Sequence, residues 1–123
     1  MATTESAEQI VTRFCDSWKR RDADELMTFF TDDAVYHNVP LDPAVGPEAI
    51  RATIDLFIGM APEIRFEITR QLAAGDVVMN ERVDYLTVGD KTVALPVAGV
   101  FEVRDGKISV WRDYFDMATF MGT

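Results

Sequence analysis

Hydrophobic and polar positions alternate through the middle of the chain, most regularly over residues 77–88. Branched and apolar residues favour a long strand there, and the Gly-Asp pair at 89–90 predicts the turn that ends it. Because successive side chains of a strand point to opposite faces, Asn80, Arg82 and Asp84 share one face. If that face lines a closed interior, each charge needs a charge-assisted partner. We therefore expect a further polar group from elsewhere in the chain to join them.

In the segments before this strand, apolar residues recur at helical spacing. This spacing predicts a first amphipathic helix over residues 6–21 and a second, short helix over residues 23–30. A third helix is predicted over residues 47–58, where Ile50, Ile54, Phe57 and Ile58 form an apolar stripe and a proline suits the first position. Gly59 and Pro62 are expected to end that helix.

The remaining segments favour strands. Residues 63–70 alternate almost perfectly, which predicts a strand with one wet and one dry face. Pro96 interrupts a later strand and indicates an edge position or a bulge. In all, these strands are predicted at residues 34–39, 63–70, 91–103 and 108–115. A short tail helix is predicted at residues 116–121.

Helices first and long strands after them are typical of an α+β fold. We expect one domain over residues 1–123, in which helices pack on one face of a curved, mixed but largely antiparallel sheet. The helices and that face should enclose a conical pocket, which would suit a small, mostly apolar ligand.

Charge and cysteine content narrow the classes of partner. Twelve Lys and Arg against twenty-one Asp and Glu give a net charge of −9, which repels nucleic acids and anionic membranes. Cys15 is the only cysteine, so no intrachain disulfide forms and a reducing compartment is indicated. The start of the chain lacks the pattern of a signal peptide, and no apolar run is long enough to cross a membrane. We expect a cytoplasmic protein. His37 is the only histidine, so we expect no metal site.

The final strand carries a carboxylate between two aromatic residues, with Trp111, Asp113 and Phe115 on one face. Antiparallel neighbours could bring Asp113 opposite Arg82 and Asp84, forming an Asp–Arg–Asp row. The guanidinium would stay charged, while burial would let one carboxyl hold a proton and the other stay ionised. Such a row places an acid beside a base at neutral pH. Without Asp113, the pair Arg82 and Asp84 would be more typical of a surface ion pair.

Three dyads on predicted strands, Tyr36-x-Asn38, Arg82-x-Asp84 and Trp111-x-Asp113, carry a resemblance. Their order and spacing resemble the active-site pattern of the limonene-1,2-epoxide hydrolase family, over nearly the whole chain. The resemblance implies a nuclear-transport-factor-2-like or cystatin-like architecture and a homodimer.

The resemblance also implies a reaction. A small, mostly apolar epoxide, cyclic or terpene-like, would gain water in one step and give a vicinal diol, without a covalent intermediate, a metal or a cofactor. Asp113 would be the general base on a water also held by Tyr36 and Asn38. Asp84 would protonate the epoxide oxygen, and Arg82 would bridge the two carboxyl groups.

Alternation and helical spacing suggest the walls of the pocket, although Trp111 is also expected to have a packing role. The predicted substrate contacts are Leu86, Leu95, Val97, Phe115, Phe57, Phe66, Phe120 and Trp111. The same architecture serves ketosteroid isomerases, polyketide cyclases and non-catalytic ligand carriers, so fold alone leaves these alternatives open. An isomerase would not need an arginine between two carboxyls, so Arg82 favours the hydrolase. Cys15 is interpreted as a small core residue.

Overall fold

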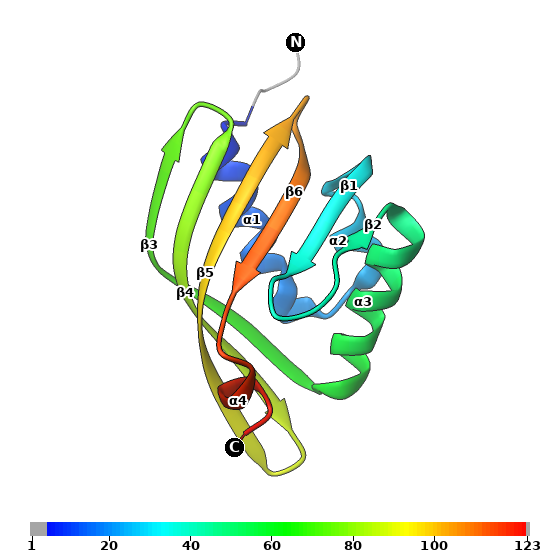
Figure 1. The fold of residues 1–123 in the computed structure, drawn as a ribbon, viewed down its shortest axis with the longest axis vertical. Coiled ribbons are helices and arrows are strands. Elements are labelled where there is room, and N and C mark those ends of the chain that lie inside the picture. The colour runs from blue at the N-terminus through cyan, green and yellow to red at the C-terminus, as the bar shows by residue number, and fades with distance from the viewer. Residues whose placement is uncertain (1–4, 123) are drawn as a thin grey trace.

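Helices cover one face of a curved, twisted sheet in the computed structural model, which describes residues 5–122 (Figure 1). The helical elements are α1 (Ala7–Ser17), η1 (Trp18–Arg20), α2 (Ala23–Met27), α3 (Pro47–Met60) and α4 (Met117–Phe120). The strands are β1 (Phe30–Asn38), β2 (Ala44–Val45), β3 (Glu63–Ala74), β4 (Val77–Val88), β5 (Lys91–Arg104) and β6 (Lys107–Tyr114). None of the helices within residues 5–122 has the length and apolar content needed to span a membrane.

The strands form one mixed sheet in the order β2-β1-β6-β5-β4-β3. The pair β1 and β6 is parallel, and all other neighbouring strands of this sheet are antiparallel. In Figure 1, α1 crosses the face of the sheet, α3 lies beside β1 and β2, and α4 lies beside β5 near one end. The predicted α+β fold is confirmed.

The first helix begins at a capping box. The hydroxyl of Ser6 accepts a hydrogen bond from the Gln9 backbone N–H, and the Gln9 side chain accepts one from the Ser6 N–H. Its apolar face is buried against the sheet, with Phe14 and Cys15 at the centre. The α-helix ends at Ser17, earlier than predicted, because the chain tightens into the 3₁₀ turn η1.

Aromatic side chains form the centre of the core. Phe14 meets the ring of Trp111 edge to face at 4.8 Å, and Trp18 stacks on Phe66 at 5.0 Å. Such pairs contribute about 1 kcal/mol each beyond their burial. These contacts join α1 and η1 to β3 and β6, and so fix the helical layer over the sheet.

Several other element boundaries differ from the prediction, among them those of the second and third helices and of β1. The second helix ends at Met27 instead of residue 30, and β1 already begins at Phe30, whose strand partner is Ile108 on β6. Pairing with a distant strand therefore overrides the local helical pattern. The third helix continues through Gly59 to Met60, since a glycine in a helix costs only about 1 kcal/mol.

Pro96 lies in a part of β5 that has only one neighbouring strand. This agrees with the edge position that was one of the two predictions for it. Its strand β5 is central in the sheet, but pairing between β5 and β6 begins only at Ala98. Opposite Val83 of β4, Pro96 therefore lies where β5 has a single neighbour, and its missing N–H breaks no hydrogen bond to β6.

Candidate active site

Alternate residues of β4 face the helices and are buried, as the sequence pattern predicted. They are Val78, Asn80, Arg82, Asp84 and Leu86, while the residues between them are exposed or half-buried. The Arg82 side chain has no solvent exposure. Its charge must therefore be balanced entirely by neighbouring side chains.

Two carboxylates and one amide supply that balance. The Nε and Nη2 atoms of Arg82 donate to the two oxygens of Asp84 at 3.0 and 2.9 Å. Its Nη1 and Nη2 atoms donate to the two oxygens of Asp113 at 3.2 and 2.7 Å. Nη1 also donates to the Asn80 side-chain oxygen at 3.1 Å. The guanidinium thus holds both carboxyl groups in fixed positions.

The row spans three strands, whereas the sequence suggested that the strands carrying Arg82 and Asp113 could be direct neighbours. Strand β5 lies between β4 and β6, and its residue Gly99 pairs with Asn80 on one side and Asp113 on the other. A Cβ at Gly99 would lie 2.5 Å from Nη1 of Arg82, 2.8 Å from the Asn80 oxygen and 3.0 Å from an Asp113 oxygen. The absence of a side chain at Gly99 therefore lets Arg82 reach across β5.

Asn80 and Gly99 are members of the site to which the sequence analysis assigned no role. Asn80 shares the face of Arg82, and that alternation was the available signal. Its Nδ2 donates to Gln71 at 3.1 Å and lies 3.9 Å from the sulfur of Cys15. Burial raises the pKa of the Cys15 thiol to about 12, so this group stays neutral, as expected for a core cysteine.

Burial makes the two kinds of charge in the row respond differently. It raises the pKa of Asp84 to about 6, although Arg82 opposes this shift and the nearby Asp113 adds to it. Burial alone would lower the pKa of Arg82, but the charges of Asp113 and Asp84 raise that pKa well above its ordinary value. Arg82 is therefore permanently charged, and Asp84 holds a proton below about pH 6.

Tyr36 and Asn38 approach the row from β1. The parallel pairing of β1 with β6 sets Tyr36 beside Trp111 and Asn38 beside Asp113. The Tyr36 ring stacks on Trp111 with centroids 4.0 Å apart, and both Tyr36 and Asn38 are buried. Burial, together with the charge of Asp113, raises the pKa of Tyr36 well above its ordinary value. Its hydroxyl therefore remains a neutral donor and acceptor.

A small cavity of about 30 Å³ opens beside these polar groups. Tyr36, Asn38, Asp84 and Asp113 line it, together with Trp18. Six of the predicted wall residues also line it: Phe57, Leu86, Leu95, Val97, Phe115 and Phe120. The space suffices for about one water molecule, so an organic ligand requires the wall to move.

Two of the predicted contacts lie behind this wall. Phe66 packs between Trp18 and the guanidinium of Arg82, which lies 5.0 Å from its ring centroid. Trp111 is fully buried, and its indole N–H donates to an oxygen of Asp113 at 2.6 Å. Trp18, in contrast, lines the cavity but was not predicted to do so. Its helical spacing indicates burial without distinguishing a wall residue from a core residue.

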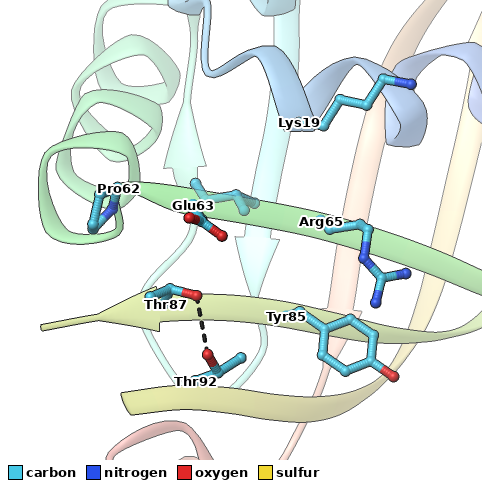
Figure 2. Close-up of a pocket in the computed structure, with 8 residues that line it drawn as sticks. Lys19, Pro62, Glu63, Arg65, Tyr85, Thr87 and Thr92 are labelled. Atoms are coloured by element: carbon cyan, nitrogen blue, oxygen red, sulfur yellow. Dashed lines mark hydrogen bonds between the residues drawn. The ribbon is translucent and has the colours of Figure 1, made fainter. Parts of the chain in front are cut away.

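A larger hollow of about 400 Å³ lies elsewhere, between Lys19 and the strands β3, β4 and β5 (Figure 2). There the guanidinium of Arg65 lies over the Tyr85 ring at 4.2 Å. The cations of this hollow are already paired, Lys19 with Asp16 and Arg65 with Glu67. The hollow is open to solvent and has no buried acid–base group, so we place the candidate active site at the smaller cavity. Within residues 5–122, no cluster of three or more His, Cys, Asp or Glu residues is arranged to bind a metal ion.

Comparisons with known proteins agree with this arrangement. The family model for the limonene-1,2-epoxide hydrolase catalytic domain matches residues 5–123. Epoxide hydrolase EphG of Mycobacterium tuberculosis is 39% identical over 109 residues, which cover 87% of this chain and 71% of that protein. Together with the fold and the buried row, these matches define a hydrolase. The chain belongs to the limonene-1,2-epoxide hydrolase family.

Solved structures that match this chain include one member of the family and proteins that share only its fold. The structure of an LEH-like epoxide hydrolase from M. tuberculosis matches with a TM-score of 0.83 and 34% identity, covering 94% of this chain and 86% of that one. A protein from Catenulispora acidiphila with a ketosteroid isomerase-like fold matches with a TM-score of 0.84 and 24% identity, covering 98% and 92%. A SnoaL-like protein from Shewanella putrefaciens matches with a TM-score of 0.83 and 17% identity, covering 94% and 83%. The last two share the fold alone.

Proposed function

We propose that this protein adds water to a small, mostly apolar epoxide, cyclic or terpene-like, and releases a vicinal diol. The observation that carries the proposal is the single guanidinium of Arg82 bound to both Asp84 and Asp113 at the end of an apolar cavity. An epoxide is a strained electrophile, so a base acting on water and an acid acting on the epoxide oxygen suffice to open it. The proposed reaction uses neither a metal nor an organic cofactor.

Asp113 is the proposed general base. It lines the cavity next to Asn38, its strand neighbour, and near Tyr36. The neutral hydroxyl of Tyr36 and the amide of Asn38 can hold one water molecule against the Asp113 carboxylate. As the oxygen of this water bonds to an epoxide carbon, one of its protons passes to Asp113.

Asp84 is the proposed general acid. Burial raises its pKa to about 6, which supports a protonated carboxyl in mildly acidic solution, and it lines the same cavity. It gives its proton to the epoxide oxygen as the carbon–oxygen bond breaks. Asp113 then holds the proton taken from water and Asp84 is ionised, so one proton must return to Asp84 before the next turnover. Arg82 keeps both carboxyl groups in place throughout.

The apolar wall supports the proposed substrate class. Phe57, Leu86, Leu95, Val97, Phe115 and Phe120 are the proposed substrate contacts. The rings of Phe57 and Phe120 lie 5.9 Å apart, and those of Phe115 and Phe120 lie 5.7 Å apart. These three aromatic side chains come from α3, from the residue directly after β6 and from α4, so a shift of α4 would widen the cavity. Phe66 and Trp111 would support the wall from behind.

Other functions of the same fold account less well for the site. An isomerase that uses one carboxylate base has no use for Arg82 between two carboxyls. A ligand carrier has no need for a buried row of three ionisable side chains, since burying charged groups is costly.

We also propose that the chain works as a single domain, as a homodimer and in the cytoplasm. Support for the dimer comes from the sheet face opposite the helices. Met79 is 55% exposed and Tyr114 is 46% exposed there, with Ala98 and Val100 on the strand between them. A lone buried cysteine agrees with a reducing compartment.

Turnover of a panel of small cyclic and terpene epoxides tests the proposed function. Asp113→Asn and Asp84→Asn should each lower diol formation roughly 10³-fold, the size of a lost general acid or base. Asp90→Asn, at an exposed turn, is the matched control and should retain full turnover. Undiminished turnover in both buried variants would contradict the proposal.

A further inference from the structure

The two carboxyl groups of the buried row differ in their hydrogen-bond partners. Arg82 donates to both oxygens of Asp84 and to both oxygens of Asp113. Asp113 also accepts a hydrogen bond from the Trp111 indole at 2.6 Å. Arg82 therefore gives the two carboxyl groups the same number of hydrogen-bonded oxygens, and the hydrogen bond from Trp111 makes their surroundings different.

The strand register fixes the indole in this position. Trp111 pairs with Tyr36 of β1 on one side and with Phe101 of β5 on the other. Its ring stacks on both, with centroid distances of 4.0 and 5.7 Å and interplanar angles of 4° and 14°. Phe14 closes the edge of the ring from α1 at 4.8 Å. The indole cannot turn without breaking these contacts, so its N–H stays directed at Asp113.

An indole N–H can donate but cannot accept. It stabilises Asp113 when that carboxyl is an acceptor with a full negative charge, and hydrogen bonds to charged groups are the stronger ones. We propose that Trp111 is a positioning residue that keeps Asp113, rather than Asp84, the ionised member of the pair. This assignment rests on the proposed function, because it explains how one carboxyl becomes the base and the other the acid.

The other titratable groups near Asp113 do not supply this asymmetry. Arg82 and Asp84 face it from β4, Tyr36 from β1 and Cys15 from α1. Burial holds the pKa of Tyr36 and of Cys15 well above neutrality, so both stay uncharged. Among these groups, Asp84 is the other carboxyl bound to Arg82.

The test is the pH profile of kcat/KM in Trp111→Phe, which keeps an aromatic ring and removes the N–H. Ionisation of Asp113 should become harder, so the ascending limb should move up by about one pH unit or more, the size expected for a lost charge-assisted hydrogen bond. The descending limb, which mainly reports the proton on Asp84, should move less than the ascending limb, because the two carboxyls are coupled.

Trp18→Phe is the matched control. Trp18 is also buried, but its indole nitrogen has no hydrogen-bond partner among the described residues. Since Trp18 lines the cavity, KM can change in this variant, but both limbs of the profile should stay in place. If Trp111→Phe is slower at every pH but both limbs of its pH profile stay in place, Trp111 acts only through packing. That result would overturn the inference.

Two further measurements keep the inference testable. If Trp111→Phe folds poorly, benzothienylalanine at position 111 replaces the N–H with sulfur at almost constant shape, and the same limb shift is expected. Carbon-13 NMR titration of the aspartate carboxyls needs no substrate. It should show Asp113 ionised while Asp84 takes up its proton, with this difference reduced in Trp111→Phe. An equal titration of the two carboxyls in the unmodified protein would overturn the inference. Absence of epoxide turnover with an unequal titration would instead refute only the proposed function.

Discussion

The Nη2 atom of Arg82 lies 2.7 Å from the Oδ2 atom of Asp113, although a whole strand separates the two residues in the sheet. The guanidinium reaches this far because Gly99 of the intervening strand has no side chain. Charge balance in the buried site therefore depends on a glycine as well as on the charged residues.

Replacing Gly99 by alanine should separate the arginine from Asp113. The new Cβ would lie 2.5 Å from Nη1 of Arg82, closer than side-chain atoms can approach. We expect kcat/KM to fall about 10- to 100-fold, and the free energy of unfolding to fall by roughly 1–3 kcal/mol, as in other overpacked sites. Steady-state kinetics and urea unfolding measure the two effects.

Gly59→Ala is the control for this substitution. Gly59 lies in α3, and a methyl group at this position would have no neighbouring atom within 4 Å. Its backbone is not left-handed, so alanine fits there without strain. Alanine should leave turnover unchanged and raise the free energy of unfolding by up to about 1 kcal/mol. Equal activity of Gly99→Ala and Gly59→Ala would show that the close approach at Gly99 is unimportant.

The activity should fall as pH rises through about 6 in the free enzyme. Burial raises the pKa of Asp84 to about 6, so the proton needed by the epoxide oxygen is present below that pH and lost above it. At lower pH, activity should fall again as the second carboxyl takes up a proton, which gives a bell-shaped profile. Its two limbs belong to the coupled pair of Asp84 and Asp113. A kcat/KM value that rises steadily from about pH 5 to about pH 9 would contradict the assignment of Asp84 as the acid.

The sheet face opposite the helices, which carries Met79 and Tyr114, should form the dimer contact. Met79→Glu places a charge on this face and should convert a dimer to a monomer at micromolar concentration. Leu56→Glu is the control, because Leu56 is 66% exposed on the helix α3, away from the sheet face. Sedimentation velocity measures the oligomeric state of both variants. A dimer that persists in Met79→Glu would place the contact elsewhere.

The sequence allowed prediction of much of the fold and of the charged row. Strict alternation in β4 placed Asn80, Arg82 and Asp84 on one buried face, because a strand has a fixed period of two. Asp113 could be added since a carboxylate between Trp111 and Phe115 needs a partner. These inferences depend on local geometry, which sequence records well.

The pairing of the strands was harder to predict from the sequence. The position of β5 between β4 and β6, and therefore the need for Gly99, follows from the register of three strands. The role of Trp111 depends on the direction of its N–H, and Phe66 was assigned to the wall although it lies beneath Arg82. Alternation gives the face of a residue but not its depth behind a cavity.

A single turnover in oxygen-18 water tests the central claim most directly. With enzyme in excess over epoxide, direct attack by water predicts one labelled oxygen in every diol molecule and no label in any carboxylate of the protein. An unlabelled diol from the first turnover, with the label appearing in Asp113 or Asp84, would reveal a covalent ester and contradict the one-step mechanism.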